Sequence, residues 1–213
     1  MKKVLSSFTA LTLVIVMLAG LTSCASERNR LLGSWTGTMS LADSFNSLLS
    51  AQNEEVADIM KIDKFDLKVT YSFNAGGTYS VDIDNDSLVQ AVEGLKENMK
   101  NSLRGYFDQE IKNQGLEISV DEMLELSGMS IDELVDQSME ALNTDDMAGM
   151  FVESGNFSVE DGKLITNSGG AEEIVTYELD GSELKITGSV SAGNSEAAEF
   201  TDTIYPIVLT KAN

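Results

Sequence analysis

Short segments in which apolar and polar residues alternate recur along the chain, and this period of two constrains the fold more than any other feature. In residues 33–41, Trp35 and Met39 fall on one face and threonines on the other. Residues 65–83 repeat the alternation on both sides of a Gly-Gly turn, and residues 157–210 repeat it between Asp-Gly turns. The pattern predicts about eight antiparallel strands in a sandwich or an up-and-down barrel.

The alternation also predicts which side chains fill the inside of such a barrel. Each strand has one buried face, so every second residue points toward the core. The expected inward side chains are Trp35, Leu67, Val69, Tyr71, Phe73, Tyr79, Val81, Phe157, Leu184 and Ile186.

A helical block interrupts the strands over residues 87–149. Apolar residues recur every three or four positions through 88–111, which predicts one amphipathic helix. Ser-x-x-Glu capping boxes at 119–122 and 130–133 predict the starts of two shorter helices. Helical spacing also predicts a helix between residues 39 and 65, which would connect the first two strands.

The first 24 residues have the pattern of an export signal. Lys2 and Lys3 precede an uncharged apolar run over residues 4–20, which is short for a membrane span. The sequence Leu-Thr-Ser-Cys that ends at Cys24 resembles the lipobox of bacterial lipoproteins. That resemblance implies a signal peptide over 1–23 and a diacylglycerol on Cys24. The alternative is an uncleaved anchor helix with a free thiol.

The lipobox resemblance also implies where the protein resides and how it is held there. Residues 25–30 are polar, and residues 24–31 are expected to form a tether. Two acyl chains provide stable anchoring without any contact between the polypeptide and lipid. We therefore expect an extracytoplasmic lipoprotein, anchored to a membrane of a bacterial cell envelope.

The charge and residue composition exclude several classes of function. The chain has 35 acidic and 14 basic residues, no histidine and one cysteine, with a formal charge of -21. A histidine-based zinc site, a Ser-His-Asp triad and a Cys-His dyad are impossible, and so is an intrachain disulfide. The acidity argues against nucleic acid as a partner. Glycine-rich nucleotide motifs are absent from the sequence, so we expect neither an enzyme nor a cofactor.

Gly33-Ser34-Trp35 at the first strand, placed just after the tether, resembles the bacterial lipocalin-like lipoproteins. The resemblance covers residues 32–86 and 150–211, whereas 87–149 has no counterpart in that family. It implies a lipocalin-like barrel in which Gly33 and Trp35 close one end beneath a basic residue of the last strand. Lys211 takes that place here, where the family more often has arginine.

The resemblance further implies a small apolar ligand inside the barrel. Five aromatic residues of the predicted strands would line the ligand site: Tyr71, Phe73, Tyr79, Phe157 and Tyr177. An eight-stranded barrel is just wide enough for one such molecule.

Four acidic residues suggest a calcium site. Asp82, Asp84 and Asp86 are spaced by two, and Glu93 is twelfth counted from Asp82, as in an EF-hand loop. Ser87 stands where that loop needs glycine. The simpler interpretation is that Asp82 and Asp84 lie on the solvated face of a strand.

Two classes of function therefore remain open for a monomeric chain. In the first, which the lipocalin-like resemblance favours and which we expect, the barrel binds the apolar ligand. In the second, aromatic bulk fills the barrel, and the helical block docks an envelope partner or a divalent cation. Thirteen acidic and no basic residues lie between Lys112 and Lys163, which favours a basic or cationic partner. A solvated face that keeps the protein soluble would have the same composition.

Overall fold

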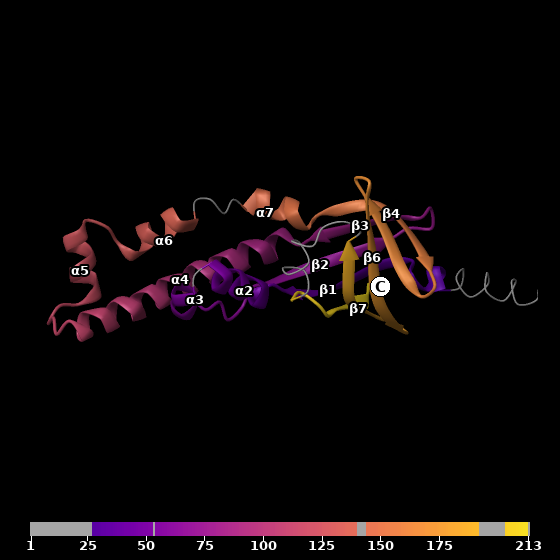
Figure 1. The fold of residues 1–213 in the computed structure, drawn as a ribbon. Helices are drawn as coiled ribbons and strands as arrows, with labels where there is room; N and C mark the ends of the chain where they lie inside the picture. The colour runs from indigo at the N-terminus through magenta and orange to yellow at the C-terminus, as the bar shows by residue number, and fades with distance from the viewer. Residues whose placement is uncertain (1–26, 53, 140–143, 192–202, 213) are drawn as a thin grey trace, which may run out of the picture.

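The computed structural model describes residues 27–52, 54–139, 144–191 and 203–212. Eight strands form a closed barrel in which each pairs antiparallel with its sequence neighbours, and the last pairs with the first (Figure 1). The strands are β1 (Gly33–Ser40), β2 (Asp66–Phe73), β3 (Thr78–Ile83), β4 (Glu153–Glu160), β5 (Lys163–Ser168), β6 (Ala171–Asp180), β7 (Glu183–Ser191) and β8 (Ile207–Lys211). The predicted fold class, an up-and-down barrel of about eight strands with a helical insertion, is confirmed.

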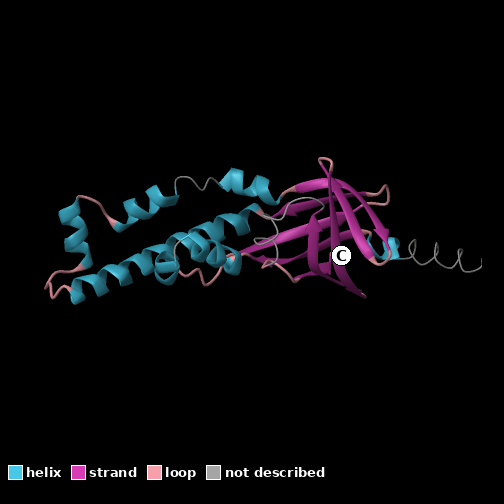
Figure 2. Ribbon diagram, viewed as in Figure 1, coloured by secondary structure: helices cyan, strands magenta, loops and turns pink. Residues whose placement is uncertain are grey.

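Helices occupy two of the connections between strands. Two short helices, α2 (Ala42–Gln52) and α3 (Glu54–Ile59), connect β1 to β2. Four helices between β3 and β4 form what we call the arm: α4 (Asn85–Asn113), α5 (Val120–Ser127), α6 (Ile131–Met139) and α7 (Thr144–Phe151). Figure 2 shows the arm projecting from one end of the barrel, opposite the end at which the described chain begins.

Side chains that alternate along the strands fill the barrel. Of the ten predicted inward side chains, Tyr71 is half-buried and the others are buried. Phe73 and Phe157 meet edge to face with ring centroids 5.1 Å apart, a favourable aromatic geometry. The register pairs inward residues across neighbouring strands, as with Tyr71 and Val81. The core therefore follows directly from the period of two.

The arm has two separate apolar cores. Near the barrel, Leu88, Val92 and Leu95 of α4 belong to the main core together with residues of the strands. Far from the barrel, Ile111 and Leu124 belong to a second cluster with neighbours on α5 and α6. The proximal arm is thus part of the barrel's core, whereas the distal arm has a small core of its own.

Three ion pairs join α4 to the returning helices. Lys96 pairs with Asp136 at 2.8 Å, Lys100 with Asp132 at 2.7 Å, and Arg104 with Asp121 at 3.0 Å. The basic partners are spaced by four, so they lie along one face of α4. The hydrogen bond from Lys96 lowers the pKa of Asp136. Part of the acidic stretch is therefore neutralised inside the arm and does not form a uniformly acidic face.

Both predicted capping boxes are confirmed. The Ser119 hydroxyl accepts from the Glu122 backbone at 3.2 Å, and the Glu122 carboxylate accepts from the Ser119 backbone at 2.7 Å. Ser130 and Glu133 make the same pair of bonds. These backbone donors lower the pKa of each glutamate. Helix starts in the distal arm are thus specified by local sequence.

Candidate functional site

One end of the barrel is closed by residues that the sequence analysis had grouped. Trp35 is fully buried, and the Lys211 ammonium lies 4.8 Å from its ring centroid, a cation–π contact. Gly33 has a φ of +114°, and a Cβ there would lie 3.2 Å from the Lys211 side chain. Gly33, Trp35 and Lys211 therefore come together, as the family resemblance implied, and their role is structural.

The chain before β1 covers this closed end. Residues 27–31 are helical, and Leu31 is fully buried. The Leu31 carbonyl accepts from the Trp35 indole at 2.6 Å, and the Arg30 carbonyl accepts from Lys211 at 3.1 Å. The Arg28 side chain donates to the Ala75 carbonyl at 2.8 Å. This part of the predicted tether is thus packed against the barrel.

The inside of the barrel holds little free space. Its cavity measures about 40 Å³, which is enough for a few water molecules. Of the five predicted ligand-lining residues, Tyr71, Phe73 and Tyr79 line the cavity, whereas Phe157 and Tyr177 do not. The complete lining is Tyr71, Phe73, Tyr79, Val81, Glu153, Leu164, Thr166, Glu173, Val175, Ile186 and Tyr205.

Two carboxylates in this lining were not predicted as site residues. Glu153 accepts a short hydrogen bond from the Tyr79 hydroxyl, and Glu173 accepts one from the Ser189 hydroxyl. A sequence signal for them did exist. Glu173 is two residues before Val175, which is buried, so the alternation along this strand places both side chains on the same face.

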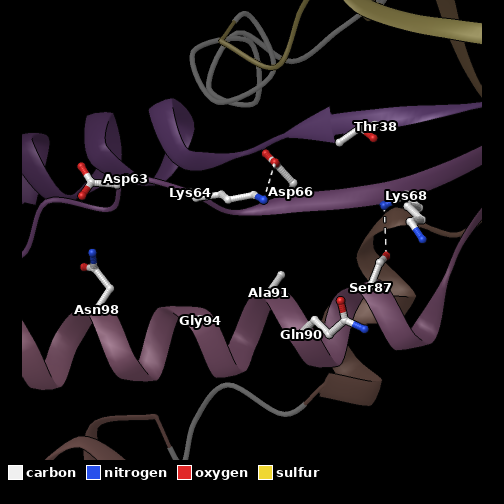
Figure 3. A pocket seen from close by; sticks show the side chains of 10 residues that line it. All are labelled: Thr38, Asp63, Lys64, Asp66, Lys68, Ser87, Gln90, Ala91, Gly94 and Asn98. Atoms are coloured by element: carbon white, nitrogen blue, oxygen red, sulfur yellow. Dashed lines mark hydrogen bonds and ion pairs between the residues drawn. The ribbon is translucent and has the colours of Figure 1, made fainter.

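A larger hollow lies outside the barrel, between α4 and the strands β1 and β2. This groove has a volume of about 440 Å³. Figure 3 shows α4 on one side of it and the segment from Asp63 to Lys68 on the other. The lining residues are Thr38, Asp63, Lys64, Asp66, Lys68, Ser87, Gln90, Ala91, Gly94 and Asn98.

The groove is chemically polar. Lys64 pairs loosely with Asp66 at 3.7 Å, and the Lys68 backbone donates to the Ser87 hydroxyl at 3.0 Å. Gly94 leaves part of the α4 wall open, since an added Cβ there would meet no atom within 4 Å. The Asn98 side-chain oxygen is buried and accepts no hydrogen bond from any described residue. The groove therefore offers charges and amides, without an aromatic side chain among its described lining residues.

Sequence reasoning did not identify this groove. Its residues come from β1, the segment before β2, β2 itself and α4, which are far apart along the chain. They share no motif and no regular spacing. The groove depends on how far α4 stands from the sheet, which periodicity does not specify.

The structure does not bring the four residues of the suggested calcium site together into one cluster. Asp82 is exposed on β3, and Glu93 is exposed on α4. Asp84 caps the start of α4 and accepts from the Ser87 backbone at 2.7 Å, while Asp86 lies in the first turn of that helix. Among the described residues, no group of three or more acidic, histidine or cysteine side chains could hold a metal ion. The arrangement supports the simpler interpretation, in which these acids are solvated or cap a helix.

Cys24 lies outside the described residues, so the lipid anchor stays a prediction. The described helices include none that is both long and apolar enough to cross a membrane.

No protein-family model and no curated protein matches the chain. Among solved structures, fatty-acid-binding protein 1 of Echinococcus granulosus is similar to 87% of this chain and 99% of its own, with 10% identity and a TM-score of 0.27. The fold is therefore defined by the strand pairing itself, and membership of the lipocalin-like lipoproteins stays a prediction.

Proposed function

We propose that this chain is a membrane-anchored, extracytoplasmic bacterial lipoprotein that acts by binding a polar partner in the groove between the barrel and α4, and that it is not an enzyme. One observation carries the proposal: the larger hollow is outside the barrel. The groove measures about 440 Å³ and the barrel interior about 40 Å³. Sites for small molecules occupy roughly 300–1,000 Å³.

The filled interior favours the interaction protein over the binder of an apolar ligand. An apolar ligand would have to displace side chains such as Phe73 and Ile186, which are already buried against their neighbours. Interiors are close-packed, so such displacement is costly. The barrel then serves as a rigid support for the groove and the arm.

The chemistry of the groove indicates what kind of partner it accepts. The Asn98 side-chain amide lines the groove and can both donate and accept hydrogen bonds. The exposed Lys68 and Gln90 can bond carboxylates and amides. A polypeptide segment with both donors and acceptors complements these groups, and we propose that the partner is an envelope protein.

The shape of the molecule supports an anchor at Cys24. The described chain, which starts at residue 27, begins at the barrel end opposite the arm (Figure 1). A diacylglycerol on Cys24, three residues earlier, would hold that end at the membrane. The groove and the arm would then point away from the lipid, toward partners in the envelope.

The groove can be tested with a matched pair of glycines on α4. Gly94 lines the groove and Gly105 does not, and a Cβ at either position meets no atom within 4 Å. A photo-crosslinking amino acid at Gln90 should yield a discrete crosslinked product in the native host. Gly94→Phe should abolish that product by filling the groove, whereas Gly105→Phe should preserve it.

Two results would contradict this proposal. One is a crosslinked product that is equally strong in both glycine variants. The other is an apolar molecule in near-stoichiometric amount, found by native mass spectrometry and lipid extraction of protein from its own host, because such a molecule would place the binding site inside the barrel.

A further inference from the structure

Two carboxylates point into the barrel near the end that carries the arm. Glu153 is the first residue of β4 and lies in register with the inward Val81 of β3. Glu173 lies on β6, in register with the buried Thr166 of β5. Both line the same cavity of about 40 Å³, so they face one interior space from strands on either side of β5.

Among the described residues, none with a positive charge lines this cavity. Its lining contains neither lysine nor arginine, and the two glutamates are held by neutral hydroxyls. Tyr79 donates to Glu153, and Ser189 donates to Glu173. Two ionised carboxylates that share a poorly solvated space repel each other, and a proton on one of them removes the repulsion.

We propose that Glu153 and Glu173 form a proton-operated latch at the arm end of the barrel: one proton held by the pair keeps this rim closed, and ionisation of both carboxylates loosens it. The latch is independent of the groove function proposed above. It acts on β4 and β6, where the two side chains originate, and leaves the closed Trp35 end unaffected.

Among the described residues, three tyrosines are the other titratable groups that line this space. They are Tyr71, Tyr79 and Tyr205. Burial raises the pKa of Tyr71 and of Tyr79, so both hydroxyls stay neutral across the physiological range. Burial, and then the charge of Glu153, raise the pKa of Glu173.

The direction of the pH effect follows from the raised pKa. The folded state holds a proton on Glu173 more tightly than the unfolded chain, so it is favoured at low pH. That stabilisation is complete below the ordinary glutamate pKa of about 4.3 and is lost as the pH rises through the folded-state value. Mild acid should therefore tighten the rim, and neutral to alkaline pH should loosen it.

The experiment compares thermal unfolding midpoints between pH 4 and pH 8 for wild type and four variants. Glu173→Gln and Glu153→Gln each remove one charge of the pair, and the double variant removes both. Glu172→Gln is the matched control, because Glu172 is exposed on the same strand. Amide hydrogen exchange across residues 153–157 and 171–175, corrected for intrinsic pH dependence, reports on the rim itself.

The latch predicts that Glu173→Gln raises the midpoint relative to Glu172→Gln at pH 8 and that this difference vanishes at pH 4. Each single substitution already removes the repulsion, because the remaining carboxylate has no charged partner. The unfolding midpoint of the double variant should therefore rise by less than the sum of the rises in the two single variants. Exchange at the rim should speed up with pH in wild type and in Glu172→Gln, but not in Glu173→Gln.

Three results would overturn the latch. One is the same pH dependence in Glu173→Gln and Glu172→Gln, and another is full additivity of the two rim substitutions. The third result is that the pair of carboxylates binds a divalent cation instead of a proton. In that case, excess CaCl₂ at neutral pH would raise the unfolding midpoint of wild type and leave the midpoint of the double variant unchanged.

Discussion

Trp35 connects three parts of the chain that are distant in sequence. Its ring is fully buried beneath Lys211 of the last strand, and its indole nitrogen donates to Leu31 in the segment before the barrel. A tryptophan is the largest side chain available to fill the end of a barrel, and its N–H needs a partner when buried. The residue therefore has a structural role at this end.

Truncating this side chain should be strongly destabilising. Trp35→Ala removes the buried ring and leaves a cavity, so it should lower the free energy of unfolding by about 3–5 kcal/mol. Val208→Ala, on the solvent side of the adjoining strand β8, is the control. Urea denaturation followed by circular dichroism measures both. A loss for Trp35→Ala no larger than that for Val208→Ala would contradict the role assigned to Trp35.

At the scale of elements, α4 connects the main core of the barrel to the distal cluster of the arm. Its first turns contribute Leu88, Val92 and Leu95 to the main core, and its last turns contribute Ile111 to the distal cluster. The ion pairs between these regions are at least partly solvent-exposed, and such pairs contribute little to stability. The proximal arm is therefore held mainly by packing, and the distal arm is a separable extension.

Two deletions should distinguish these halves of the arm. Removing residues 101–131 and joining Lys100 to Asp132 with a Gly-Ser linker deletes the distal cluster, and the joined residues already form an ion pair at 2.7 Å. This variant should unfold cooperatively, with near-UV circular dichroism like the full chain. Removing residues 87–149 takes α4 residues out of the main core, so that variant should lose cooperative unfolding. Equal cooperativity of the two variants would show that α4 adds nothing to the barrel.

The whole molecule is elongated, with the closed barrel end at one extreme and the distal arm at the other (Figure 2). The groove lies at the junction between barrel and arm, so its walls move apart or together with any motion of α4 relative to β2. An anchor at the closed end would leave both the groove and the arm accessible.

The anchor itself is tested by changing one residue. Cys24→Ala should prevent acylation and leave the protein either uncleaved or in the soluble fraction. Fractionation of host cells and intact-mass measurement of the membrane-associated form provide the readout. Wild-type protein in the membrane fraction with an unmodified Cys24 would contradict lipidation.

A feature of the structure could be predicted from the sequence when residues close together in the chain specify it. The paired Ser119–Glu122 cap needs only neighbouring residues, and the sequence predicted it correctly. Glu173 was detectable from the alternation around Val175, but the sequence analysis did not include it among the site residues. The position of Asn98 in the groove was not detectable, because it depends on how α4 packs against the barrel.

The sequence by itself determined the class of fold, the inner face of each strand and the helix starts, because periodicity and capping are properties of short segments. Trp35 and Phe73 point inward for this reason alone. Only the tertiary structure decided that the barrel is filled and that the larger hollow lies beside α4. Free volume depends on how side chains from eight strands and a helix fit against one another, and that fit is set by distances between elements, which no local pattern encodes.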